Sequence, residues 1–470
     1  MAVLSGVVDP LYNPRVIPRA VRRGRGLPTP VLWLDASSGG FSNQGQAGSI
    51  LDAQNGSTGG VDTNDVQVLP HNGTNYLYLP GVSGNQASAP DLAAYTPAAS
   101  LDVRIALSMD AVSGTQAFVG HYAASGTDRS WLFMYTGTNV SLHLSTNGTT
   151  ATQFTPSVSP TIVAGTVTLL QATWTASPAE VKFFQKATTE GAAANDLAVD
   201  TGWTQVGTTI TASVPTVSLA NSTANLVVGA QSSIDLLAGR VYRTQVRAGG
   251  TVVFDANFTR LTSGAATSFT ESSANAATVT INRAASGRKS TVATRPTWLF
   301  GTDDFLQVSD HPLLNFDATQ DMTAVVALEQ WGTPSSYARM IAKRAGGGST
   351  VGWSLGDNNL ALEGSMFNGD GTTGAGAVGA ALTAGVRATT GGIVARGAAT
   401  MRAFANNTLS GSAPSIAGMG SFVNSQPLRV GSDSAVVTST LDAALDTALV
   451  YRRALSSGEV AALVAYLGAA

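Results

Sequence analysis

The chain has 470 residues, of which only 12% are charged, and its formal net charge is −3. This length exceeds what one hydrophobic core usually serves, so two domains are expected, and the charge is too small to indicate a nucleic-acid partner or an acidic substrate. The absence of cysteine excludes disulfides and thiolate metal sites. No apolar run approaches the roughly 18 residues that a membrane span needs.

The first 26 residues predict an extended arm. Prolines recur from Pro10 to Pro30 and disfavour a helix. We expect the arginines of this stretch to pair with carboxylates of a neighbouring subunit: Arg15, Arg19, Arg22, Arg23 and Arg25. The alternative is a weakly ordered tail. The stretch lacks the basic-then-apolar pattern of a signal peptide.

Beyond the arm, apolar residues alternate with a period of two, which indicates strands. Val140–Leu144 and Phe305–Val308 are examples, and clusters of Gly, Asn, Ser and Thr between such runs predict turns. Many short strands with frequent turns are typical of a β-sandwich or jelly roll. One helix is expected, at the C-terminus, where Ser456 and Glu459 fit a capping box and four apolar residues form one stripe: Val460, Leu463, Val464 and Leu467.

The two halves of the chain resemble each other at a period of roughly 220 residues. The matched pairs are Val31–Ala36 with Val252–Ala256, Gly73–Leu77 with Gly301–Leu306, Trp131–Phe133 with Trp353–Leu355, Val228–Gly229 with Val430–Gly431, and Val241–Arg243 with Val450–Arg452. Their common order predicts a duplication with its boundary at Gly249–Gly250. We therefore expect an arm over 1–26, a first jelly-roll domain over 27–249 and a second over 250–470.

The opening Leu32–Ala36 and the closing Leu449–Ser456 with Glu459 resemble a concanavalin A-like, laminin-G-type jelly roll. The pair of such domains is similar to minor tail proteins of phages that infect actinobacteria. This resemblance implies an all-β fold of two tandem jelly rolls and a position in a virion. The first half lacks a closing helix after Tyr242, so its loops need not be equivalent to those of the second half.

The glycoside hydrolase alternative requires two carboxylates on either side of the scissile bond. Hydrolases of this fold usually carry them on one strand as Glu-x-Asp-x-(x)-Glu. The six glutamates are scattered and none has that spacing: Glu180, Glu190, Glu271, Glu329, Glu363 and Glu459. The sequence therefore favours a protein that is not an enzyme and has no cofactor.

Two tryptophans beside turns, Trp203 and Trp331, are the candidates for stacking on a sugar ring, whereas tryptophans inside strand-like runs are expected in the core. Asp303, Asp304 and Asp310, or else Asp433 with Asp442, are candidate ligands for calcium, which takes several oxygen ligands. The alternative is that these aspartates bond their own backbone in turns.

Together these observations predict a bacteriophage virion protein, a minor tail or tail-tip component whose domains contact a host-surface glycan. It would be assembled in the host cytoplasm with other virion proteins, as a homo-oligomer. The alternative is a capsid or tail decoration or fibre protein with a purely structural role.

Overall fold

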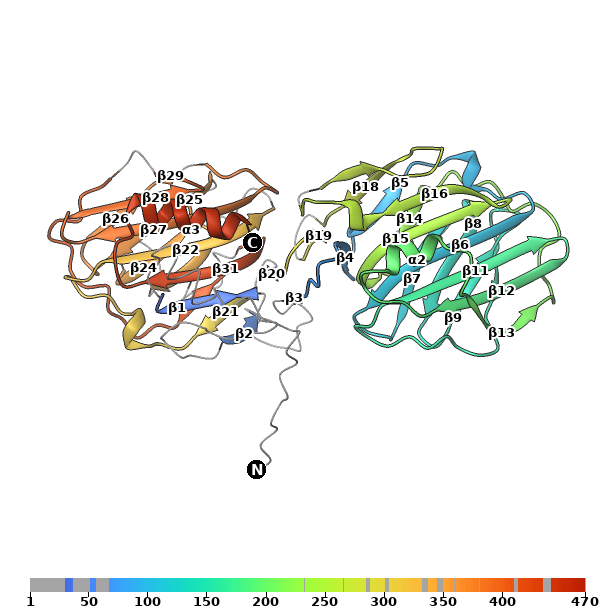
Figure 1. Ribbon diagram of the computed structural model, residues 1–470, viewed down its shortest axis with the longest axis horizontal. Coiled ribbons are helices and arrows are strands. Elements are labelled where there is room, and N and C mark those ends of the chain that lie inside the picture. Colours follow the sequence, from blue (N-terminus) through green and yellow to red (C-terminus); the bar gives the residue numbers. More distant parts are fainter. Residues whose placement is uncertain are drawn as a thin grey trace, which may run out of the picture. The chain divides into compact units, whose positions relative to one another are not determined.

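The computed structural model describes residues 30–36, 51–55, 67–231, 233–264, 266–284, 288–300, 304–331, 337–344, 350–358, 361–379, 381–409, 413–433 and 441–469. The predicted arm therefore lies outside the described residues. The chain divides into two compact units (Figure 1). Unit 1 consists of Met1–Pro70 and Arg295–Ala470, and unit 2 is the continuous segment His71–Thr294.

Unit 2 is an antiparallel sandwich of two sheets. Sheet 2a has the order β13 (Thr204–Ile210), β12 (Ala179–Lys186), β11 (Thr168–Ala176), β6 (Ser100–Met109), β15 (Ala238–Ala248), β4 (Tyr76–Pro80) and β19 (Thr291–Ala293), and β16 (Thr251–Asn257) also pairs with β15. Sheet 2b has the order β10 (Thr152–Phe154), β9 (Val140–Leu144), β8 (Arg129–Thr136), β7 (Thr115–Tyr122), β14 (Leu226–Val228), β5 (Gln86–Ala89), β18 (Thr278–Asn282) and β17 (Ser268–Thr270).

Unit 1 is built in the same way. Sheet 1a has the order β29 (Thr408–Leu409), β28 (Thr400–Ala405), β27 (Arg387–Ala395), β22 (Met322–Gln330), β31 (Ala443–Tyr451), β20 (Thr297–Phe300) and β3 (Gln67–Leu69), and β1 (Leu32–Asp35) also pairs with β31. Sheet 1b has the order β2 (Leu51–Asn55), β21 (Asp304–Val308), β30 (Leu428–Val430), β23 (Arg339–Arg344), β24 (Gly352–Asn358), β25 (Ala361–Gly369) and β26 (Gly374–Ala377). The all-β fold class is thus confirmed.

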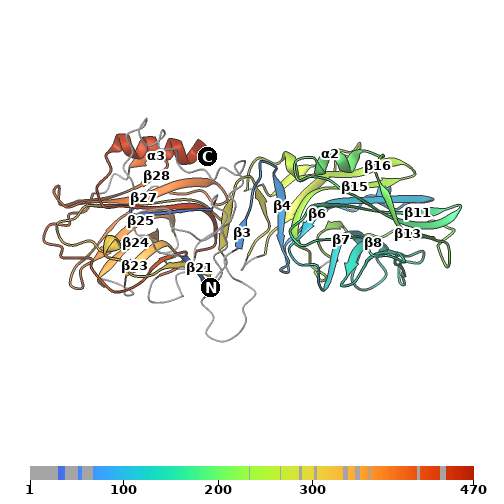
Figure 2. The same ribbon diagram turned by 60° about the horizontal axis from the view of Figure 1, so that its bottom comes forward.

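Each unit has its own hydrophobic core between its two sheets, which Figure 2 shows as layers. Trp131 and Trp174 are fully buried in unit 2, and Trp353 is fully buried in unit 1. Trp33 is also fully buried, in the cluster that includes α3. Because successive side chains of a strand point to opposite faces, one face of each strand supplies this core. The expectation that tryptophans within strand-like runs are core residues is confirmed.

The predicted C-terminal helix is present as α3 (Ser457–Ala469). Its capping box is formed, because the Ser456 amide donates to Glu459 Oε2 at 2.9 Å and the Glu459 amide donates to Ser456 Oγ at 3.3 Å. The buried side chains of the apolar stripe pack against the outer face of sheet 1a, and Figure 2 shows the helix along that sheet. Among the described residues no helix is long and apolar enough to cross a membrane.

The structure corrects the predicted domain boundary. Gly249–Gly250 is the turn of a hairpin in which β16 pairs with β15, so it lies inside unit 2. The chain instead passes between units at Pro70–His71 and again at Thr294–Arg295. Neither unit therefore coincides with the predicted segments 27–249 and 250–470.

Three of the five matched motifs are also corrected. Leu77 lies on β4, which corresponds in sheet order to β20, whereas Leu306 lies on β21. Strands β1 and β16 correspond, but Asp35 takes the place of Asn257, so the match with Val252–Ala256 is shifted by two residues.

Strand β15 has an extra, bulged residue at Tyr242, and β31 has the corresponding bulge at Asp446. Tyr242 thus occupies the place of Asp446, and Val241–Arg243 does not overlie Val450–Arg452.

The match of Trp131 with Trp353 has the expected register. Trp131 lies opposite His121 and Trp353 lies opposite Lys343, and each of these partners follows the corresponding bulge of its strand by the same number of residues.

Candidate functional site

Trp203 is half-buried and has its polar contacts within unit 2. Its indole Nε1 donates to the Val199 carbonyl at 3.0 Å. The guanidinium of Arg104 and the ammonium of Lys186 lie 5.5 and 5.9 Å from the ring centroid. The ring thus packs against two cations of its own unit. Less of the ring surface is therefore open to a sugar than expected for a tryptophan beside a turn.

Trp331 belongs to unit 1, so the structure does not bring the two predicted tryptophans into one site. It is half-buried, and its Nε1 donates to Glu329 Oε1 at 3.2 Å. Its backbone amide donates to the Asp442 carbonyl at 3.1 Å, which continues the pairing of β22 with β31. The sugar-stacking role of Trp331 stays a prediction.

The predicted calcium ligands Asp304 and Asp310 differ in burial. Asp304 is fully buried on β21, whereas the exposed Asp310 forms an ion pair with Lys343 at 2.8 Å and accepts from Asn315 at 3.0 Å. Within the described part of the chain no group of three or more His, Asp or Glu side chains could hold a metal ion. Asp303 lies outside the described residues, so the calcium site stays a prediction.

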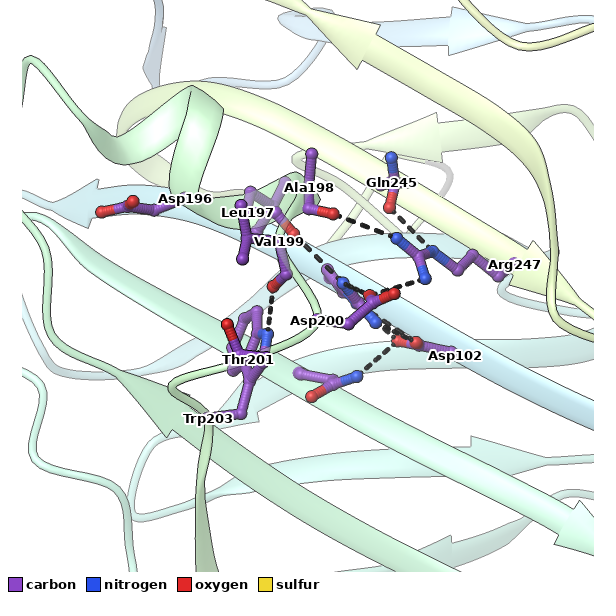
Figure 3. A network of polar contacts seen from close by, with 12 residues as sticks. Asp102, Asp196, Leu197, Ala198, Val199, Asp200, Thr201, Trp203, Gln245 and Arg247 are labelled. Carbon is purple, nitrogen blue, oxygen red and sulfur yellow. Dashed lines mark hydrogen bonds and ion pairs between the residues drawn. The ribbon is translucent and has the colours of Figure 1, made fainter.

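A dense polar network that includes Asp102, Asp200 and Arg247 covers the outer face of sheet 2a (Figure 3). Arg104 makes several of its contacts. Arg104 donates through Nε and Nη2 to Asp102, at 3.0 and 2.6 Å, and pairs through Nη1 with Asp200 at 2.8 Å. Gln171 Nε2 adds a bond to Asp102 Oδ1 at 2.8 Å. Arg247 Nη1 reaches Asp200 from the other side at 2.7 Å.

The same arginines hold the short helix α2 (Ala193–Ala198) on the sheet. Arg104, Arg243 and Arg247 donate to the carbonyls of Leu197, Ala194 and Ala198, at 3.2, 2.9 and 3.3 Å. The last four carbonyls of a helix have no partner within the helix, so the bonds to Leu197 and Ala198 satisfy two of them. The contacts of Figure 3 join sheet residues to one another and to the end of α2, and we interpret the network as structural.

We expect Arg104→Ala to lower the free energy of unfolding of unit 2 by about 3–5 kcal/mol, because it would leave the Asp102 carboxylate without its buried cation. The side chain of Arg104 is only 4% exposed. The exposed Arg402 on β28 is the control, since Arg402→Met should change stability by less than about 0.5 kcal/mol. Calorimetry would measure both, and equal effects of the two variants would contradict the structural role.

A second polar group lies on the outer face of sheet 1b. Arg429, Ala342 and Ser354 lie side by side on neighbouring strands, and the residues before and after each of them face the core. We call Arg339, Arg344, Arg429 and Asp433 the arginine cluster. Asp433 Oδ2 is 3.9 Å from the Nε atoms of both Arg339 and Arg344. Arg429 Nη1 donates to the Asp433 carbonyl at 3.0 Å.

The arginine cluster differs from the network of Figure 3 in being incompletely paired. The side chain of Arg339 is 7% exposed and that of Asp433 is 5% exposed. Nevertheless Nε and Nη1 of Arg339 and Oδ1 of Asp433 have no hydrogen-bond partner in the structure. Burial, followed by the nearby charge of Arg344, lowers the pKa of Arg339 to about 10. Asp433 alone thus leaves two nitrogens of the buried Arg339 guanidinium without a hydrogen bond, which favours an anionic group.

Aromatic rings flank the cluster. The guanidinium of Arg339 lies 4.8 Å from the ring centroid of Phe367, and that of Arg429 lies 4.1 Å from the ring of Phe305. The ring centroid of Tyr337 lies 5.5 Å from the guanidinium of Arg339, and Tyr337 is 40% exposed. An arginine beside aromatic faces can donate to a carboxylate of a ligand, while the aromatic rings pack against an apolar ring face.

The corresponding sheet of unit 2 carries no such cluster on its described residues. Its outer face bears Ala117, Leu132 and Met134, which form a small apolar cluster with Tyr122. The arginines are therefore a property of unit 1 and not a requirement of the fold. The sequence pattern that could have indicated the cluster is Arg339–Arg344, in which three of six residues are charged. In the structure this strand is buried throughout. From sequence alone, so many charged residues would indicate a strand at the solvent-exposed edge of a sheet.

Each glutamate has a partner within the protein. Glu271 accepts from the amides of Asp255 and Ser273 at 3.0 and 2.6 Å, and Glu190 accepts from the Tyr242 hydroxyl at 2.8 Å. The others pair locally: Glu180 with Lys182, Glu329 with Trp331, Glu363 with Ser365, and Glu459 with Ser456. These contacts organise turns and strands, and no two of these carboxylates interact.

No protein-family model matches the chain, and no curated protein sequence matches it. Among solved structures, domains LG4-5 of the mouse laminin α1 chain are 11% identical over 81% of this chain and 90% of theirs, with a TM-score of 0.29. The binding domain of Paraclostridial Mosquitocidal Protein 1 is 14% identical over 37% of this chain, which spans 44% of that protein, with a TM-score of 0.31. The CBM40 of Ruminococcus gnavus IT-sialidase is 16% identical over 31% of this chain and 84% of its own, with a TM-score of 0.25. Similarity this low carries no argument on function.

Proposed function

We propose that the chain is a non-catalytic binding protein whose unit 1 recognises an acidic carbohydrate through the arginine cluster. The observation that carries the proposal is the buried guanidinium of Arg339, with two nitrogens that have no hydrogen-bond partner in the structure. A buried donor without a partner costs about 1–3 kcal/mol, more when it is charged, and a ligand carboxylate would recover that cost. Arg344 and Arg429 supply further positive charge.

The wider proposal is a virion protein, a minor tail or tail-tip component that contacts a host-surface glycan. It is supported by the low charge of the chain, the two jelly-roll sandwiches and the sequence resemblance to phage tail proteins. In this proposal the N-terminal arm with Arg15, Arg19, Arg22, Arg23 and Arg25 docks on a neighbouring virion protein. Mass spectrometry of purified particles that contain the chain tests the location, and its absence from the particle would overturn it.

A glycan array with the full chain tests the ligand. We expect binding to glycans that carry a carboxylate and no binding to their neutral counterparts. Arg339→Met should reduce that binding at least tenfold while the protein stays folded. Replacing an underpaired buried charge by an apolar side chain of similar size is often neutral or stabilising.

The matched control is Arg402→Met, which removes an exposed arginine from the other sheet of the same unit. It should bind as the unchanged protein does. Equal binding by the Arg339→Met variant would show that the ligand lies elsewhere. A complete lack of carboxylate-dependent binding by the unchanged protein would overturn the proposed ligand class.

A further inference from the structure

We infer that the two units are a tandem duplication whose repeats have exchanged their three leading strands. We call β1–β15 repeat 1 and β16–β31 repeat 2. Each compact unit then contains the leading strands of one repeat and the remaining strands of the other. This inference concerns the architecture and does not depend on the proposed function.

The sheet orders of the two units correspond strand for strand. In sheet 2a the order β13-β12-β11-β6-β15-β4-β19 matches β29-β28-β27-β22-β31-β20-β3 in sheet 1a. In sheet 2b the order β10-β9-β8-β7-β14-β5-β18 matches β26-β25-β24-β23-β30-β21-β2 in sheet 1b, with β17 as an addition. Even the strands outside these paths agree, because β16 pairs with β15 as β1 pairs with β31.

Local irregularities coincide as well. Strands β7 and β23 each have a bulged residue, at Phe118 and Met340. The carbonyls of these two residues accept from the amides of Gly229 and Gly431, at 2.9 and 3.0 Å. Both glycines have positive φ, 88° and 94°. The bulges of β15 and β31 also correspond. Bulges are specific local features, so their agreement supports a duplication more strongly than sheet order alone.

The correspondence shows which strands have changed places. β16, β18 and β19 hold in unit 2 the positions that β1, β2 and β3 hold in unit 1. Yet β16–β19 follow β15 along the chain, whereas β1–β3 precede β4. Without an exchange, β1 would pair with β15 of its own repeat, and β16 would pair with β31.

The turn between the repeats accounts for the exchange. Ala248 pairs directly with Thr251, so only Gly249 and Gly250 connect β15 to β16. Their φ angles are 58° and 82°, and a two-residue type I′ hairpin turn requires positive φ at both positions. A connection this short places β16 beside β15, where β1 would otherwise pair. β1 is left to pair with β31.

The exchange can be tested in the full chain with engineered disulfides, because the chain has no cysteine of its own. Asp35 lies opposite Thr447 in the β1–β31 pair. Directly opposed strand residues are within the Cα separation that a disulfide spans. We expect Asp35→Cys with Thr447→Cys to form a disulfide within one chain, seen as faster migration of the denatured, unreduced protein.

The matched alternative is Asp35→Cys with Arg243→Cys. Arg243 follows the bulge of β15 as Thr447 follows the bulge of β31, so this pair would be bridged only without the exchange. Bridging of this pair and not the first would overturn the inference, as would a bridge that links two chains. If Arg243→Cys impairs folding, Leu69→Cys with Thr297→Cys provides a second test, since these residues are opposed in the β3–β20 pair. Failure of both exchanged pairs to bridge in folded protein would also overturn it.

Discussion

We expect Trp131→Ala and Trp353→Ala each to unfold one unit selectively, at a cost of about 3–5 kcal/mol in the free energy of unfolding of that unit. The two residues hold equivalent places in sheets 2b and 1b, and both are fully buried. Truncation of either indole would leave a large cavity, which surrounding side chains fill only partly. Because each unit has a separate core, the loss should stay within one unit.

Conservative replacements at the same positions should differ from each other. Trp131 Nε1 donates to the buried Tyr95 carbonyl at 2.8 Å, whereas Trp353 Nε1 has no hydrogen-bond partner in the structure. Trp131→Phe therefore loses a bond and should cost about 1 kcal/mol more than Trp353→Phe. Calorimetry of the full chain would follow one transition per unit. Equal shifts of both transitions in either alanine variant would contradict independent cores.

Much of the fold was predictable from local sequence patterns. The period of two marks strands because one face of each strand is buried, and the C-terminal helix carries its own cap and apolar stripe. The matches of Trp131 with Trp353 and of Val228–Gly229 with Val430–Gly431 indicate the duplication. What local patterns do not contain is the partner of a strand. The sequence of Leu32–Asp35 predicts a strand equally well whether that strand pairs with β15 or with β31.

The same limit explains the outcome for the candidate residues. Trp203 follows a turn, as a surface tryptophan often does, yet Arg104 and Lys186 from other strands lie against its ring. Arg339 and Asp433 are far apart in sequence, and only the sheet brings them together. Their incomplete pairing is a property of the folded environment. No composition or spacing rule would find it.

The two units should respond oppositely to pH between about 4 and 7. In unit 1, burial raises the pKa of Asp357 from 3.8 to about 7, and burial also raises the pKa of Asp446. The folded unit then retains a proton that the unfolded chain releases. This contribution to stability is fully present below pH 4 and is lost as the pH rises to 7. For Asp357 the loss is on the order of 2–4 kcal/mol.

In unit 2 the sign is reversed because the groups are histidines. Burial lowers the pKa of His143 from 6.5 to about 4, and burial, partly offset by Asp91, lowers that of His121. The unfolded chain takes up protons that the folded unit does not. The contribution is therefore present above pH 6.5 and is lost as the pH falls towards 4. For His143 the loss is about 2 kcal/mol, since this side chain is only half-buried.

Calorimetry at pH 4.5 and pH 7.5 should accordingly show the transition of unit 2 moving up with pH and that of unit 1 moving down. Asp357→Asn should flatten the response of unit 1 and leave unit 2 unchanged. His143→Phe should flatten the response of unit 2. Phenylalanine is the residue at the equivalent position of unit 1, because Phe367 lies opposite Ser354 as His143 lies opposite Leu132. Parallel shifts of both transitions, or a pH response of unit 1 that survives Asp357→Asn in full, would show that other groups control the stability in this range.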